Sequence, residues 1–195
     1  SLTKPINDQI GWITGSQVCY CAEAFQGVPR EHPDAPALSV LATVLRNGFL
    51  HTAIREKGGA YGAGATNDTS TNTFKFFSYR DPKCTETFAA FKDAIEWSKT
   101  SITDQHLEEA ILGVVSSIDK PLSPVGEAKN DFNFNLENIT TKERLEMRQQ
   151  VINCSIEDLI RVSKKYLTQN SKKSILAGEA YREEAALLGL TLREV

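Results

Sequence analysis

The chain has 195 residues, of which 41% are hydrophobic and 24% are charged, as in an ordinary globular protein. Its 22 basic and 25 acidic residues give a net charge of -3 and form no basic stripe, which argues against a nucleic-acid partner. No apolar run approaches the roughly 20 residues that cross a bilayer, so no membrane partner is expected. The first ten residues show no signal-peptide pattern, and the chain starts with Ser1 and not with Met, so the natural N-terminus and any targeting region it carries are expected to lie upstream of this sequence. A cytoplasmic location is predicted.

The first predicted elements are a strand and a long helix. Residues 17–25 are rich in β-forming side chains and predict the strand. Apolar residues then recur at helical spacing after Asp34, which is a candidate N-cap. The helix is expected to continue to about Lys57, with Gly58 as its left-handed C-terminal cap.

Two further strands are predicted over residues 60–65 and 73–80, with a polar hairpin-like connection between them. The rest of the chain has a mainly helical pattern, which Pro121 and Pro124 are expected to interrupt. The remaining predicted elements are helices that begin at residues 85 and 104, helices over 142–153 and 155–167, a strand over 173–179 and a helix over 181–189.

Strands and helices alternate too poorly along the chain for a doubly wound parallel sheet. A mainly antiparallel sheet with helices packed on one face fits the order better, and this is the α+β class. No internal repeat, low-complexity tract or linker divides the chain, so residues 1–195 are expected to form a single domain.

The cysteines show no metal-binding spacing. None forms a Cys-x-x-Cys pair, and none has a histidine nearby at zinc-site spacing. The four positions are Cys19, Cys21, Cys84 and Cys154. Buried thiols in a reducing compartment are the expected reading, with a redox or metal role as the alternative.

A glycine-rich run at residues 58–64 follows the long helix. A phosphate-binding loop needs a strand before its glycines and a helix after them, and here a helix ends and a strand begins, so nucleotide binding is not expected. Gly62 and Gly64 instead thin one face of a strand. That thinning admits either another backbone, such as a peptide added as a strand, or a core helix.

Arg55 and Tyr61 are the side chains of chemical interest on either side of this corner. A guanidinium donates several hydrogen bonds to a carbonyl or carboxylate, and a phenol donates one to a developing oxyanion. From the residues alone, a surface arginine and an amphipathic core tyrosine are the alternative. His51 lies one helical turn before Arg55 and could face the same cleft, although an ordinary helix-surface histidine is the simpler interpretation.

Residues 106–110 (His-Leu-Glu-Glu-Ala) resemble part of the zinc motif His-x-x-Glu-His. The last position is Ala110, so the second histidine ligand is missing, and we expect no zinc site in this chain. The nucleophile-elbow motif Gly-x-Ser-x-Gly is also absent, which leaves acyl-transfer chemistry without support.

Residues 55–62 (Arg-Glu-Lys-Gly-Gly-Ala-Tyr-Gly) closely resemble a signature of the pitrilysin/insulinase family of zinc peptidases. Residues 32–38, 45–48 and 79–82 look like the presequence-protease branch, and the resemblance covers residues 13–97 best. It implies a metallohydrolase domain like those of LuxS and the mitochondrial processing peptidase. It also implies that this domain is the last of about four, arranged as two halves around a closed chamber.

The resemblance implies functional roles as well. Zinc would be the cofactor of the parent enzyme, bound by a domain of the upstream half and not by this chain. Tyr61 would be catalytic, donating a hydrogen bond to the oxyanion, while Arg55, Gly59 and Ala60 would bind the peptide substrate. The chain by itself is expected to be inactive, and its partners would be the peptide and the upstream zinc-bearing half.

Two other classes of function stay open. The parent could be a noncatalytic family member that acts as a binding or assembly subunit, in which case the upstream half would lack His-x-x-Glu-His. The chain could also be a free-standing interaction module, which predicts a stable monomer with no partner half.

Overall fold

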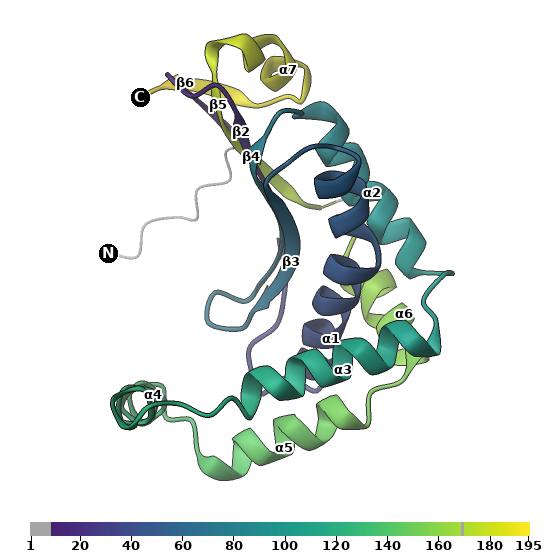
Figure 1. Ribbon diagram of the computed structural model, residues 1–195, viewed down its shortest axis with the longest axis vertical. Helices are drawn as coiled ribbons and strands as arrows, with labels where there is room; N and C mark the ends of the chain where they lie inside the picture. Colours follow the sequence, from purple (N-terminus) through teal and green to yellow (C-terminus); the bar gives the residue numbers. More distant parts are fainter. Residues whose placement is uncertain (1–8, 169) are drawn as a thin grey trace.

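The centre of the computed structural model is a curved β-sheet with helices on one face (Figure 1). The structure describes residues 9–168 and 170–195. The strands are β1 (Ile10–Thr14), β2 (Cys19–Gln26), β3 (Gly62–Asp68), β4 (Thr73–Asp81), β5 (Lys172–Gly178) and β6 (Thr191–Glu194). Within these residues the six strands lie in the order β3-β4-β2-β5-β1-β6. The pairs β3–β4, β4–β2 and β2–β5 are antiparallel, whereas β1 runs parallel to both β5 and β6.

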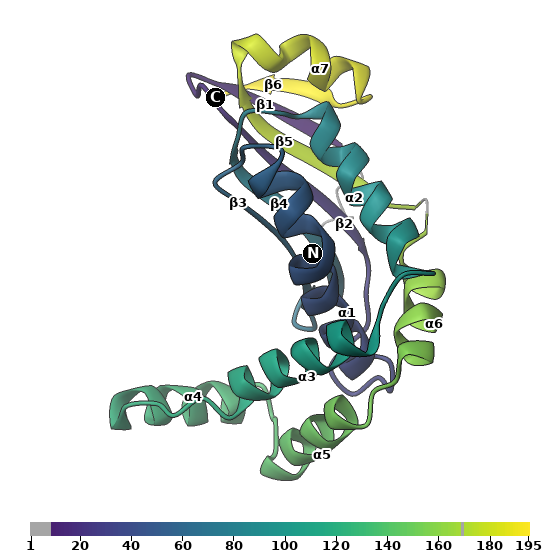
Figure 2. The same cartoon turned by 45° about the vertical axis from the view of Figure 1, so that its right-hand side comes forward.

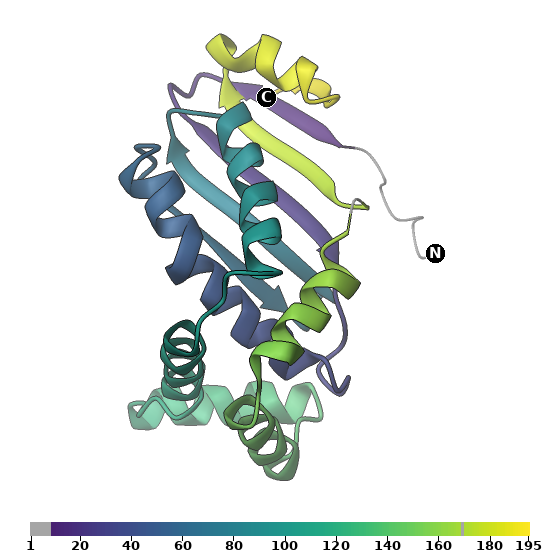
Figure 3. The same cartoon turned by 90° about the vertical axis from the view of Figure 1, so that its right-hand side faces the viewer.

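The helical elements are α1 (Ala35–Leu45), η1 (Arg46–Glu56), α2 (Thr85–Ser98), α3 (Asp104–Ile118), α4 (Pro124–Leu136), α5 (Thr141–Ile152), α6 (Ile156–Tyr166), η2 (Glu179–Tyr181) and α7 (Arg182–Leu187). Figure 3 looks through α1, α2 and α6 onto the sheet, so these helices cover the same face. Helices α3 and α4 extend away from the sheet at the end of the molecule opposite α7 (Figure 2). The predicted α+β class, with a mainly antiparallel sheet and helices on one face, is confirmed.

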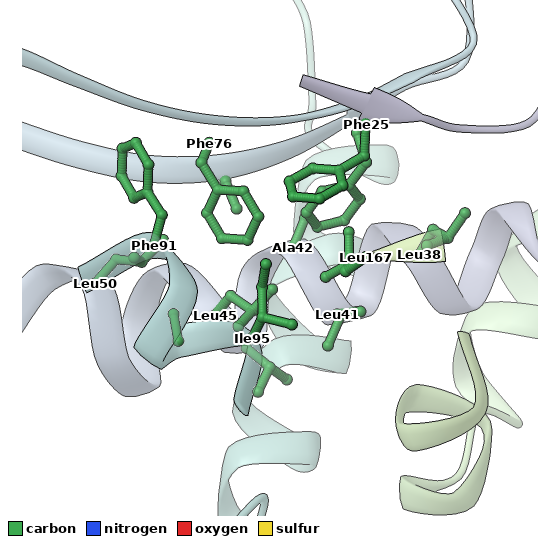
Figure 4. Packing of buried hydrophobic residues seen from close by; sticks show 14 of the residues in the cluster. Phe25, Leu38, Leu41, Ala42, Leu45, Leu50, Phe76, Phe91, Ile95 and Leu167 are labelled. Carbon is green, nitrogen blue, oxygen red and sulfur yellow. The ribbon is translucent and has the colours of Figure 1, made fainter. Parts of the chain in front are cut away.

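The core lies between the covered face of the sheet and its helices (Figure 4). Phe25 of β2 and Phe76 of β4 project from the sheet, with ring centroids 5.9 Å apart in an edge-to-face arrangement. Leu41 and Leu45 meet them from α1, and all four side chains are buried. Each buried leucine stabilises the fold by about 1.5–3 kcal/mol relative to exposure, so this interface fixes α1 on the sheet.

All four cysteines are free and buried, as the sequence predicted. Burial raises the pKa of the Cys154 thiol to about 12. The Cys154 thiol therefore stays protonated and is a poor nucleophile and metal ligand.

One continuous helix of 22 residues, formed by α1 and η1, leads from the loop after β2 to the glycine-rich corner before β3. Its second half widens to π-helical spacing, and the N–H of Lys57 donates to the carbonyl of Thr52, 3.0 Å away. By length and composition this helix could cross a bilayer, but half of its most apolar window is buried inside the fold. A core helix of a globular domain meets the same test.

The start of this helix differs from the prediction at Asp34. Its side chain makes no capping hydrogen bond, because Asp34 itself has helical backbone angles and Pro36, at the second helical position, has no N–H to offer. The buried carboxylate instead accepts hydrogen bonds from Arg161 (2.6 Å), Tyr166 (2.7 Å) and Lys165 (2.9 Å). Burial alone would raise the pKa of Asp34, but these donors hold it well below the ordinary carboxyl value.

Other helix boundaries follow the sequence well. Helices α3 and α6 begin close to the predicted residues, and their N-caps are Thr103 and Ser155, whose hydroxyls accept from the backbone N–H groups of His106 and Asp158. Pro124 departs from the prediction, because it is the first residue of helix α4 and does not interrupt a helix. At that position a backbone N–H has no partner inside the helix, so proline loses nothing by lacking one. The short strands β1 and β6 are also absent from the predicted elements.

Candidate active site

The corner between η1 and β3 folds back on the end of the helix. The N–H of Gly59 donates to the carbonyl of Arg55 and the N–H of Ala60 donates to that of Ile54, each over 3.1 Å. Gly59 has φ of +86°, so it is this glycine, and not the predicted Gly58, that takes the left-handed conformation. Ala60 is buried, whereas Arg55 on one side of the corner and Tyr61 on the other are exposed.

Tyr61 presents its phenol to solvent. The residue is 64% exposed, so the alternative of a core tyrosine is wrong. The ring packs at 5.7 Å from the ring of Tyr79 and at 5.6 Å from the guanidinium carbon of Arg80. Its N–H donates to the carbonyl of Arg80 over 3.2 Å, which fixes the backbone. Within the described residues the hydroxyl makes no hydrogen bond, so it is free to donate outward.

Arg55 is oriented by a histidine one turn earlier. Its Nη1 lies 3.0 Å from Nε2 of His51, and Nδ1 of His51 lies 3.4 Å from a carboxylate oxygen of Glu56. A tautomer protonated on Nδ1 satisfies both contacts, because Nε2 then accepts from Arg55 while Nδ1–H points at Glu56. His51 therefore does more than an ordinary surface histidine. Arg55 is exposed and makes no other side-chain hydrogen bond within the described residues, which leaves N–H donors for another molecule.

The glycines of β3 accommodate aromatic rings from β4. A Cβ at Gly62 would overlap the ring and hydroxyl of Tyr79, and one at Gly64 would lie 3.0 Å from the ring of Phe77. The space is thus filled neither by another backbone nor by a core helix, which were the two readings that the sequence offered. Because Tyr79 lies flat on Gly62, it is held against the neighbouring ring of Tyr61.

His106 serves as a helix cap. Its Nδ1 lies 3.2 Å from the N–H of Thr103, and its ring contacts Trp97 edge-on with centroids 5.1 Å apart. Ala110 is buried. Over residues 9–168 and 170–195, no group of three or more histidine, cysteine, aspartate or glutamate side chains is arranged to hold a metal ion.

The family model described as the PreP C-terminal domain matches residues 15–177. The chain belongs to this family. The resemblance to the presequence-protease branch of the pitrilysin/insulinase peptidases is therefore confirmed.

Curated relatives of this family are mitochondrial presequence proteases. That of Eremothecium gossypii is 40% identical over 80% of this chain, and that of Xenopus tropicalis is 37% identical over 85%. The chain spans 16% of the length of each of these relatives.

Solved structures show the same fold. A protease from Helicobacter pylori superposes with a TM-score of 0.75 at 20% identity, covering 89% of this chain and 45% of that one. The peptidase M16 inactive domain from Pseudomonas fluorescens gives 0.69 at 21% identity, covering 88% and 43%. Pitrilysin gives 0.64 at 14% identity, covering 96% of this chain and 22% of pitrilysin.

Proposed function

We propose that this chain completes the active site of a zinc-dependent endopeptidase that degrades peptides in a closed chamber. The observation that carries the proposal is the exposed corner, where a phenol with a free hydroxyl and a guanidinium with free donors lie on either side of Gly59. Membership of the PreP C-terminal domain family supports it, because the relatives of that family are named proteases.

Tyr61 is the proposed catalytic residue. Zinc, held by the upstream half of a longer polypeptide, would supply Lewis-acid activation of water and of the scissile carbonyl. The phenol of Tyr61 donates a hydrogen bond to the oxyanion that develops when the carbonyl is attacked. The loss of one such donor typically costs about 3 kcal/mol of transition-state stabilisation, or a factor of about 100 in rate.

Arg55 is proposed to hold a backbone carbonyl of the peptide. Its fork of donors is oriented from one side by His51, which leaves the other side for substrate. This is a positioning role, since a correctly placed carbonyl lowers the entropic part of the barrier.

Gly59 and Ala60 are proposed to bind the peptide backbone through their carbonyl groups. Their N–H groups already donate within the corner, to Arg55 and Ile54. A peptide that pairs with this segment would therefore donate its own N–H groups to it, which selects for an extended backbone and not for particular side chains.

The proposal includes an upstream partner. We infer that residues 1–195 are the last of about four domains of a longer enzyme, because the matching family model is described as a C-terminal domain and the relatives are about five times as long as this chain. The chain alone would then be inactive. The relatives are named as mitochondrial, so we propose a mitochondrial location for the enzyme in place of the cytoplasmic one expected from the sequence.

The test is cleavage of a quenched fluorescent peptide by the full-length enzyme, with and without a chelator, in the wild type and in Tyr61→Phe. A loss of about 100-fold in kcat is expected for Tyr61→Phe. Tyr20→Phe, which removes the hydroxyl of another exposed tyrosine on β2, is the matched control and should leave kcat unchanged.

Other outcomes separate the alternatives. Wild-type enzyme without chelator-sensitive cleavage would favour the noncatalytic binding or assembly subunit. Metal-dependent cleavage with the same kcat in wild type and Tyr61→Phe would overturn the role of the phenol. Failure of the chain to associate with any upstream half would favour the free-standing interaction module.

A further inference from the structure

The strand pairing slips next to Tyr61. On β2, Cys21 lies opposite Ser78 and Cys19 lies opposite Asp81. One residue of β2 therefore lies between these two pairs, whereas two residues of β4 lie between them. The extra residue forms a β-bulge at the end of β4, which contains Arg80. Bulges of this kind turn a side chain away from the direction that regular pleating would give it.

Arg80 has an unusual backbone conformation for its residue type. Its φ is +48°, in the left-handed region, which only two other non-glycine residues share in the part of the chain that the structure describes. Both of those, Asn72 and Asn138, are asparagines, which tolerate this region. An arginine there is strained, and such strain persists only where surrounding contacts impose it.

Those contacts lie on both sides of the bulge. The buried carboxylate of Asp81 accepts from the hydroxyl of Thr87 over 2.7 Å and from the N–H of Lys83 over 3.0 Å, which ties the end of β4 to the start of α2. On the other side, the carbonyl of Arg80 accepts from the N–H of Tyr61.

The result is that the Arg80 guanidinium lies over the ring of Tyr61, with 5.6 Å between its carbon and the ring centroid. Among the described residues no carboxylate pairs with Arg80, although the side chain is exposed. Tyr79 contacts the same ring at 5.7 Å. The phenol is thus flanked by a cation and a second ring, while its hydroxyl stays free.

We propose that Arg80 is a positioning residue for Tyr61. The strained bulge turns the guanidinium onto the phenol ring and thereby fixes the direction in which the hydroxyl donates. Its positive charge also favours the negative charge that develops beside that hydroxyl. The kinetic consequence rests on the proposed catalytic role of Tyr61, whereas the orientation of the ring does not.

A double-mutant cycle in the full-length enzyme tests the kinetic part. Arg80→Ala is expected to lower kcat about 10-fold with KM within about 2-fold, since misplacement of a catalytic group acts on the chemical step. Arg80→Lys, which keeps the charge but not the planar group, should recover part of this loss. In the Tyr61→Phe background, Arg80→Ala should cost nothing further. An equal loss in both backgrounds would overturn the proposal, because Arg80 would then not act through the hydroxyl.

Arg80→Gly separates positioning from folding. Glycine relaxes the left-handed backbone, so its thermal midpoint should exceed that of Arg80→Ala. Its kcat should nevertheless match that of Arg80→Ala, because both lack the guanidinium. Wild-type activity in Arg80→Gly would show that only backbone conformation matters at this position, and would overturn the proposal.

Ring signals of Tyr61 in the 195-residue chain, measured by NMR, test the orientation without any catalysis. Wild type should show a defined contact between the rings of Tyr61 and Tyr79, and Arg80→Ala should weaken and average it. Unchanged ring signals in Arg80→Ala would overturn the proposal. If Tyr61→Phe leaves kcat unchanged while Arg80→Ala still releases the ring, the proposed function has failed and the positioning role stands.

Discussion

Polar side chains at the two ends of the long α1–η1 helix differ in burial and in hydrogen bonding. At its start, Asp34 is only 4% exposed, and three side chains of α6 donate hydrogen bonds to its carboxylate. At its other end, Arg55 and Tyr61 face solvent with unused hydrogen-bonding groups. The first arrangement joins segments that are 127 to 132 residues apart in the sequence. At the second, Tyr61 contacts the neighbouring strand only through its ring and backbone N–H, and within the described residues its hydroxyl makes no hydrogen bond.

This difference indicates which polar groups fold the domain and which are left for another molecule. A buried charge without partners is costly, so Asp34 must be satisfied internally for the helix to dock. A solvated guanidinium and phenol carry no such requirement. Substitutions at the start of the helix should therefore change stability, and substitutions at its end should change activity.

The largest stability effect is expected for Asp34→Asn. The amide keeps the volume but loses the charge-assisted hydrogen bonds, which we expect to lower the free energy of unfolding by about 2 kcal/mol. Urea denaturation of the 195-residue chain measures this. Asp119→Asn is the control, because Asp119 pairs with Arg148 in an exposed bidentate contact and should leave the urea midpoint nearly unchanged. Equal shifts for the two variants would contradict the contrast.

The same carboxylate predicts a pH dependence. The pKa of Asp34 is lowered in the folded state, so its stabilisation is fully present above the unfolded value of about 3.9 and is lost as the pH falls through the folded value. Unfolding free energy should therefore decrease below about pH 4, and the decrease should be shallower in Asp34→Asn. Parallel pH profiles for wild type and variant would show that other carboxyls dominate.

At the exposed end, Gly62→Ala should impair activity more than folding. The added Cβ forces Tyr79 to move, and Tyr79 contacts the ring of Tyr61, so we expect a drop of about 10-fold in kcat of the full-length enzyme. Gly64→Ala is the matched control, since its Cβ would meet Phe77 and not Tyr79. Similar activity of the two variants would argue against a role for Tyr79 in holding Tyr61.

The smallest effect is expected for His51→Ala. Losing one exposed hydrogen bond to Arg55 should raise KM about 3-fold and leave kcat unchanged, because such a bond contributes on the order of 0.7 kcal/mol. His51→Gln, which restores an acceptor, should recover part of the affinity. A change in kcat without a change in KM would show that the histidine serves the chemical step instead.

The sequence predicted the elements that carry an apolar face. The helix predicted to begin at residue 85 is α2, where Phe88, Phe91 and Ile95 recur at helical spacing and are buried. It missed β1 and β6, because strands of five and four residues show little alternation and are stabilised by parallel pairing with distant segments. It missed α4 because a helix that buries no side chain has no apolar stripe to recognise.

The residues proposed for the candidate site come from a local motif, whereas the residues that surround them depend on tertiary pairing. Arg55 and Tyr61 lie within eight residues of one sequence signature, and the structure holds both at one corner. Tyr79 and Arg80 reach Tyr61 only because β4 pairs with β3 and slips against β2. No local pattern encodes a register shift between two strands. The left-handed arginine has likewise no signal in residue type, which would favour glycine or asparagine.

Helix α4 does not depend on the core for its contacts. None of its 13 residues is buried, so its hydrogen bonds can open without exposing any of the core. Its amide protons should therefore exchange with solvent by local fraying, while those of α1 should exchange only when the whole domain unfolds. Amide exchange rates along the chain would then separate the segments that form the core from α4, which adds no buried residue to it.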